Sequence, residues 1–257
     1  MTLIQHLVEL RRRLFFALVG IVLGTIVGWL LYDPLWAALY EPIKRIAEAR
    51  GVDEADITLT YTTITGAFEQ HLQISIVAGI VVSSPIWLYQ IFAFLVPGLT
   101  KREKRYTFGF FFSAVPLFLA GCAAGWFVLP HIVEVMTVFI PPQTAGFFDA
   151  RPYLDFVLKL VLATGIAFVL PVFLVLLNFL GLLQGPTILK GWRWAVLAIT
   201  VFAAIATPAA DILSMLLLML PMIVLYFAAV GIALIHDRWA SKRQEALLDD
   251  AGLPVTP

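Results

Sequence analysis

Two carboxylates stand out in this sequence because each lies within a short run of basic residues. Glu9 lies in HLVELRRRL, residues 6–14, and Glu103 lies in KREKR, residues 101–105. A partly desolvated carboxylate forms strong charge-assisted hydrogen bonds, and it binds a planar guanidinium through two oxygens more readily than it binds an ammonium. The pair therefore predicts a site for a cationic partner. A simpler interpretation is also open, in which each acid offsets its basic neighbours and Glu103 favours a helix start.

Other kinds of chemistry find little support in the residue pattern. The sequence has no HExxH, CxxC, GxGxxG or GxxxxGK[ST] motif, its one cysteine is Cys122, and its four histidines are scattered singly. A disulfide within the chain, a cysteine metal site and a nucleotide loop are thus not expected. The sequence predicts a protein that is not an enzyme and that needs no cofactor or metal.

The composition identifies the solvent in which these residues must be positioned. Of the 257 residues, 61% are hydrophobic and only 13% are charged. A soluble domain carries about 25% charged residues, so most of this chain is expected to lie in lipid. Seventeen basic residues balance 17 acidic ones, which argues against nucleic acid as a partner.

Charge-free runs locate the helices that would cross the membrane, because a charge at the bilayer centre is costly. They predict an all-α integral membrane protein, a single domain over residues 1–257. The six transmembrane spans are placed approximately at residues 14–32, 72–96, 106–129, 156–180, 194–208 and 212–235, with a tail at 237–257. The fifth is shorter than the roughly 20 residues that a bilayer requires. Either the bilayer thins beside it, or the helix is shielded by its neighbours, or it begins nearer residue 188.

Basic residues set the orientation, since positively charged loops stay cytoplasmic. Most lie in the first segment, in the loops after spans two and four, and in the tail, which predicts that both termini are cytoplasmic. The first hydrophobic stretch is too long for a signal peptide and is expected to stay as a helix. Pro85, Pro116, Pro171 and Pro221 lie inside spans. They are expected to bend their helices into a curved, cup-like bundle with a concave face.

Two of the outward connections carry further predictions. Residues 33–69 are acidic and are expected to form a short surface helix near 43–49. Residues 207–211 form a tight turn that makes an antiparallel hairpin of spans five and six. Asp211 begins the sixth helix, where a helix cap is the simpler explanation of an acidic residue.

Three segments together resemble one family. Residues 6–14 resemble the HLxELRxRL opening of the TatC family, the multispan receptor of the twin-arginine protein translocase. Residues 84–105, SPIWLYQIFAFLVPGLTKREKR, resemble its SPxxxYQxWxFxxPGLxxxEkR block, and residues 206–214, ATPAADILS, resemble its TPxxDxxS turn. One departure is Val169, which stands where the family often has an acidic residue.

The resemblance implies a receptor for folded proteins whose signal peptides carry consecutive arginines. Glu9 and Glu103 match the positions that contact the arginine pair in this family. Further expected signal-peptide-binding residues at the same face are Leu10, Arg11, Gln90, Phe94 and Arg105. Expected structural or partner-contact residues are Pro85, Pro97, Gly98, Thr207, Pro208 and Asp211.

The resemblance also implies partners and an energy source. The expected partners are TatA and TatB, or one TatA-like subunit serving for both, together with membrane lipid and further copies of this chain in a larger complex. Transport is expected to use the proton-motive force in the cytoplasmic membrane of a prokaryote, with the thylakoid membrane as the alternative. A small-molecule transporter and an intramembrane hydrolase are rival interpretations. Repeats, mid-span polar residues and a catalytic set are not evident for them.

Overall fold

The computed structural model describes residues 3–49, 59–60, 63–95, 101–138, 148–206 and 212–250, with backbone alone over stretches such as 101–108 and 243–250. The elements are α1 (Leu3–Leu30), α2 (Tyr32–Ala49), β1 (Leu59–Thr60), α3 (Gly66–Val82), α4 (Ser84–Leu95), α5 (Lys101–Val138), β2 (Phe148–Asp149), α6 (Ala150–Phe179), α7 (Gly185–Lys190), α8 (Trp192–Ala206) and α9 (Ile212–Asp250). The two short strands pair in parallel. The predicted all-α membrane class is confirmed.

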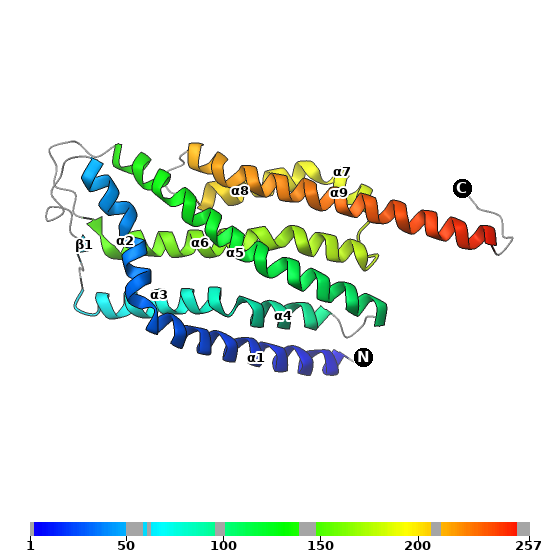
Figure 1. The fold of residues 1–257 in the computed structure, drawn as a ribbon, viewed down its shortest axis with the longest axis horizontal. Coiled ribbons are helices and arrows are strands. Elements are labelled where there is room, and N and C mark those ends of the chain that lie inside the picture. The colour runs from blue at the N-terminus through cyan, green and yellow to red at the C-terminus, as the bar shows by residue number, and fades with distance from the viewer. Residues whose placement is uncertain are drawn as a thin grey trace.

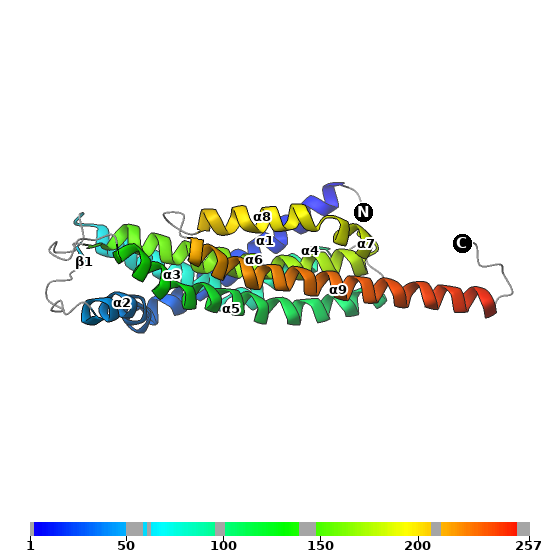
Figure 2. The same cartoon turned by 90° about the horizontal axis from the view of Figure 1, so that it is seen from above.

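The helices form a curved layer. Helices α1, α3 with α4, α6, and α8 with α9 lie side by side, and α5 crosses α6 obliquely (Figure 1). In the view from above, α8 and the start of α1 lie on one side of α6, while α2 and α5 lie on the other (Figure 2). The start of α1 and the end of α9 lie at the same end of the bundle (Figure 1). We call this the terminal end.

Four helices are long and apolar enough to cross a membrane within the described ranges: the whole of α6 and parts of α1, α5 and α9. Helices α3 and α4 together make a fifth candidate, because they are separated only by a bend of 56°. Helix α8 is a shorter apolar helix of 15 residues. A count of six spans requires α8 to serve as one, and it stays a prediction together with the span limits.

Small residues bring α1 against α3. Gly20, Gly24 and Gly28 are four residues apart and therefore lie on one face of α1. A methyl group added at Gly24 would lie 2.5 Å from the carbonyl oxygen of Gly79 on α3, and one at Gly28 would lie 2.5 Å from that of Ser75. The backbones approach this closely because neither position carries a side chain, as in small-xxx-small contacts of membrane helices.

The same device joins α5 to α6 at the centre of the bundle. A methyl group at Gly121 would lie 2.6 Å from the carbonyl oxygen of Thr164, and one at Gly165 would lie 2.6 Å from Sγ of Cys122. Beside this contact the largest apolar cluster contains Phe118 and Val169, both buried. Val169 thus packs in the protein core, where an acidic side chain would be costly.

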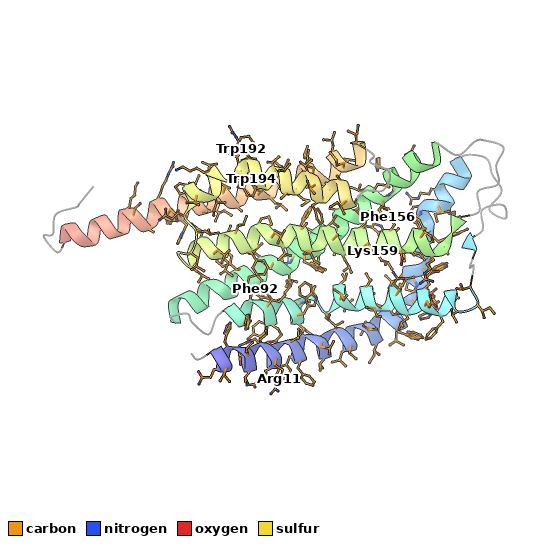
Figure 3. The ribbon with its side chains drawn as sticks, turned by 180° about the vertical axis from the view of Figure 1, so that it is seen from behind. Arg11, Phe92, Phe156, Lys159, Trp192 and Trp194 are labelled. Carbon is orange, nitrogen blue, oxygen red and sulfur yellow. The ribbon has the colours of Figure 1, made fainter. Side chains whose placement is uncertain are left out.

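The aromatic core links α4 to α6. Phe92 is 1% exposed and stacks on Phe173 with ring centroids 4.9 Å apart. Figure 3 shows Phe92 between the two helices. Trp192 and Trp194 are exposed at the start of α8 (Figure 3), as is typical of tryptophan at membrane interfaces.

Only one of the four span prolines accompanies a broken helix. Pro85 is the second residue of α4, directly after the 56° bend, and proline suits the first helical turn because the amide proton there lacks an acceptor within the helix. The indole Nε1 of Trp87 donates to the Ile80 carbonyl at 2.8 Å and so bridges the bend. Helices α5, α6 and α9 continue through Pro116, Pro171 and Pro221 as single helices.

The helix predicted near residues 43–49 is wrong in extent. Helix α2 runs over Tyr32–Ala49 and is amphipathic, with Leu39 and Ile43 buried. The hydroxyl of Tyr153 on α6 donates to the Leu39 carbonyl at 2.9 Å. The segment is therefore longer and better anchored than a surface helix, because its apolar face packs on the bundle.

Polar contacts tie the helices at both ends. At the terminal end, Asp237 of α9 accepts hydrogen bonds from Nδ2 of Asn178 at 2.9 Å and from the amide of Gly185 at 2.6 Å, which joins α6, α7 and α9. At the opposite end, Nε2 of Gln73 donates to Oδ1 of Asp155 at 2.5 Å, and Arg151 pairs with Glu69 at 3.1 Å. Both contacts join α3 to α6.

Substitution Gly79→Ala tests the close approach of α1 and α3. The added methyl would lie 2.5 Å from the Thr25 amide nitrogen, so the helices must separate, and overpacking of this kind costs about 1–3 kcal/mol. We expect a lower thermal midpoint in detergent. The matched control is Gly109→Ala, where a methyl meets nothing within 4 Å and where alanine favours the helix. Equal midpoints for both variants would contradict this packing.

Candidate functional site

The candidate site lies at the terminal end, where the start of α1 meets the end of α4. His6, Glu9 and Arg13 follow the i, i+3, i+7 pattern and therefore share one face of α1. Gln90 and Phe94 are four residues apart on α4 and likewise share a face. Contacts between these two sets are what connect the helices here.

The centre of the site is the guanidinium of Arg13. Its Nη2 lies 2.7 Å from Oε1 of Glu9, and its Nη1 lies 3.5 Å from Oε1 of Gln90. The side chains of Arg13 and Glu9 are 23% and 27% exposed, so both charged groups are partly desolvated. Nε of Arg13 is buried and has no hydrogen-bond partner among the described residues.

A ring contact between His6 and Phe94 lies beside the ion pair, one helical turn nearer to the start of α1. The centroids of His6 and Phe94 lie 4.5 Å apart with their planes inclined at 34°. Because this contact joins the second turn of α1 to the last turn of α4, it fixes the position of Glu9 relative to α4. Of the residues that the sequence predicted, the structure thus brings Glu9, Gln90 and Phe94 together.

The other predicted residues on α1 face outward. Leu10 is 42% exposed, and Arg11 lies on the side of α1 that is turned away from α4 (Figure 3). The guanidinium carbon of Arg12 lies 5.9 Å from the ring centroid of Phe16. Neither Arg11 nor Arg12 pairs with Glu9 in the described contacts.

Several predicted residues lie, wholly or with their side chains, outside the part of the chain that the structure describes. Glu103 and Arg105 belong to the first turns of α5, and their side chains lie outside the described residues. Pairing of Glu9 with Glu103 around one ligand therefore stays a prediction. Pro85 is exposed at the start of α4, at the far end of that helix from the site. The predicted residues that lie outside the described ranges are Pro97, Gly98, Thr207, Pro208 and Asp211.

Sequence reasoning missed two members of the site, His6 and Arg13. The signal was present, because Glu9 and Arg13 have the i, i+4 spacing of a helical ion pair, with the acid on the amino-terminal side. His6 lies on the same face, one turn before Glu9. Neither spacing could indicate that Gln90 and Phe94 of a distant helix complete the site.

The geometry fits recognition of an organic cation. Among the described residues, no three His, Cys, Asp or Glu side chains are grouped to hold an ion. A carboxylate and an amide oxygen from two helices instead hold the two Nη atoms of one guanidinium. A planar, forked donor matches two such acceptors better than an ammonium does.

Comparison with known proteins places the chain in a family. The sequence model for "Sec-independent protein translocase protein (TatC)" matches residues 5–221. The chain belongs to the TatC family. TatC proteins are components of a protein translocase, and this chain is accordingly a transport protein of the membrane and not an enzyme.

Individual TatC proteins agree over nearly the full length. The TatC of Xylanimonas cellulosilytica is 46% identical over 243 residues, covering 95% of this chain and 87% of that one. A chloroplastic relative from Pisum sativum is 30% identical, covering 93% of this chain and 65% of its own. A crystal structure described as the twin arginine translocase receptor TatC in DDM superposes with a TM-score of 0.75 at 26% identity, covering 89% of this chain and 99% of that one.

Substitution Phe94→Ala tests whether the ring contact anchors α1 at this TatC site. Removing an aromatic partner worth about 0.5–1.5 kcal/mol should make local opening about two- to tenfold more frequent. We expect faster hydrogen exchange over residues 4–13, measured by mass spectrometry, and unchanged exchange in α2. Phe127→Ala, which truncates an exposed ring on α5, is the control. The same exchange in both variants would show that the contact anchors nothing.

Proposed function

We propose that this chain is the signal-peptide receptor of a twin-arginine translocase and that Glu9 and Glu103 bind the guanidiniums of two consecutive arginines. The observation that carries the proposal is the position of Glu9, whose partly desolvated carboxylate contacts at 2.7 Å the guanidinium of Arg13, which in turn contacts Gln90 of α4. Glu103 lies in the first turn of α5, and this start of α5 lies at the terminal end of the bundle (Figure 1).

The orientation of the chain follows from the same proposal. The start of α1 and the end of α9 lie at one end of the bundle. Basic residues concentrate in the segments at this terminal end, as expected for the cytoplasmic side. A signal peptide that approaches from the cytoplasm would meet Glu9 before it met lipid. Its apolar part would then lie along the concave side of the layer, between α1 and α8.

Partner binding and energy coupling complete the proposed role. Helix α8 is short and exposes Leu197, Val201 and Ile205, which provides a lateral apolar surface for single-span TatA and TatB subunits. We propose that the complex lies in the cytoplasmic membrane and that the proton-motive force drives transport. A nucleotide loop is not needed for this mode of coupling.

Charge-neutral substitutions test the role of the two carboxylates. A hydrogen bond to a charged group contributes about 1.5–3 kcal/mol, so Glu9→Gln and Glu103→Gln should each weaken photocrosslinking of a twin-arginine signal peptide about 10- to 100-fold. Replacing the two arginines of the peptide by lysines should weaken its crosslinking to the unaltered protein to a similar extent, because an ammonium cannot bind a carboxylate through two parallel hydrogen bonds.

The control for these variants is Glu41→Gln on α2. Glu41 pairs with Arg45 in an exposed contact at the opposite end of the bundle, so this substitution changes the charge equally but should leave crosslinking unaltered. Membrane insertion is verified by fractionation. Crosslinking of the Glu9→Gln, Glu103→Gln double variant at the level of the unaltered protein would refute the receptor site.

A further inference from the structure

The guanidinium-binding site described above is already filled by a residue of the chain itself. Arg13 places Nη2 against Glu9 and Nη1 against Gln90, which are the contacts that an incoming arginine would need. We propose that Arg13 is an internal ligand of the site and that a signal-peptide arginine binds by displacing it. This inference rests on the proposed function and concerns how the same site is regulated.

The first argument is the shape of the site. Its two acceptors are oxygens from different helices, and one planar group spans both of them. The carboxylate of Glu9 satisfies its charge with Arg13 at 2.7 Å, so a guest that required this oxygen in the same plane would compete with Arg13. A guest guanidinium has the same charge and the same planar arrangement of N–H donors as Arg13, so it can make the same contacts after the exchange.

The second argument is that Arg13 fits the site imperfectly. Its contact with Gln90 lies at 3.5 Å, the long limit for a hydrogen bond, and its Nε is buried with no partner within the described part of the chain. A buried donor without an acceptor is costly. An ion pair between residues i and i+4 favours its paired state over the unpaired state only by roughly twofold. The occupied state is thus weakly held, as a displaceable ligand must be.

The third argument is charge. Glu9 is followed directly by Leu10 and then by Arg11, Arg12 and Arg13, so a guest with two positive charges approaches a basic surface. Of these three, Arg13 is the one that contacts Glu9, while Arg12 lies over Phe16. Removing Arg12 or Arg13 lowers the local charge equally, but only removal of Arg13 vacates the carboxylate. This difference separates competition from general repulsion.

The opposite interpretation makes a different prediction. If Arg13 only holds Glu9 in the correct rotamer for the guest, its removal weakens binding. If Arg13 competes with the guest, only a fraction of the unaltered protein has a vacant site, and the apparent affinity equals the affinity of the vacant site multiplied by that fraction. The sign of the change in affinity therefore decides between the two interpretations.

The experiment measures binding of a fluorescently labelled twin-arginine signal peptide to the full chain in detergent, by anisotropy, for Arg13→Gln and Arg12→Gln. We expect Arg13→Gln to bind the peptide roughly threefold more tightly than Arg12→Gln does. Binding by Arg13→Gln that equals or falls below that of Arg12→Gln would overturn the inference.

Two further variants keep the test decisive. Arg13→Lys retains the charge but cannot span both acceptors, so it should also bind more tightly than the unaltered protein. It replaces Arg13→Gln if that variant does not fold, and an unchanged affinity then overturns the inference. If Glu9→Gln leaves peptide binding unaltered, the proposed receptor site itself is refuted. That outcome is distinct from a failure of the proposed displacement of Arg13.

Discussion

Lipid removes the driving force that holds most helical proteins together, and this fold depends on what replaces it. Since lipid tails are as apolar as leucine, burying leucine against leucine gains little, and van der Waals contact between backbones becomes the main attraction. Gly24 and Gly79 between α1 and α3, and Gly121 and Gly165 between α5 and α6, allow that contact. The first pairing positions α1, which carries Glu9, and the second positions α5 and α6, which carry the buried cluster around Phe118.

Polar side chains act at the ends of these close-packed helices, where water and head groups are near. Asp237 joins three helices at the terminal end, and Gln73 with Asp155 joins two at the opposite end. The middle of the bundle relies on aromatic and aliphatic packing, as around Phe92 and Phe118. Glu9, the carboxylate of the proposed receptor site, follows this division, because it lies near the start of α1, where a charge costs less than at the bilayer centre.

The sequence predicted the features that depend on composition and on local spacing. The helical membrane class follows from missing charges, and the basic clusters together with the family motifs indicated Glu9, Gln90 and Phe94. It could not predict the length of α2, because Leu39 and Ile43 become buried only through packing on distant helices. It also missed Arg13, since an intrahelical ion pair is usually a solvated surface contact and only the neighbouring Gln90 gives it another meaning.

The bend between α3 and α4 sets the direction of α4 and therefore the position of Gln90 in the site. Ser83 and Ser84 are buried there, and among the described side chains their hydroxyls have no partner, so the described side-chain hydrogen bond across the bend is the one from Trp87 to the Ile80 carbonyl. Gln90 lies six residues beyond Ser84, about 9 Å along the helix. A tilt of about 10° would then displace Gln90 by about 1.6 Å. The distance between the two guanidinium acceptors therefore depends on the angle between α3 and α4 as well as on the packing of α1 against α4.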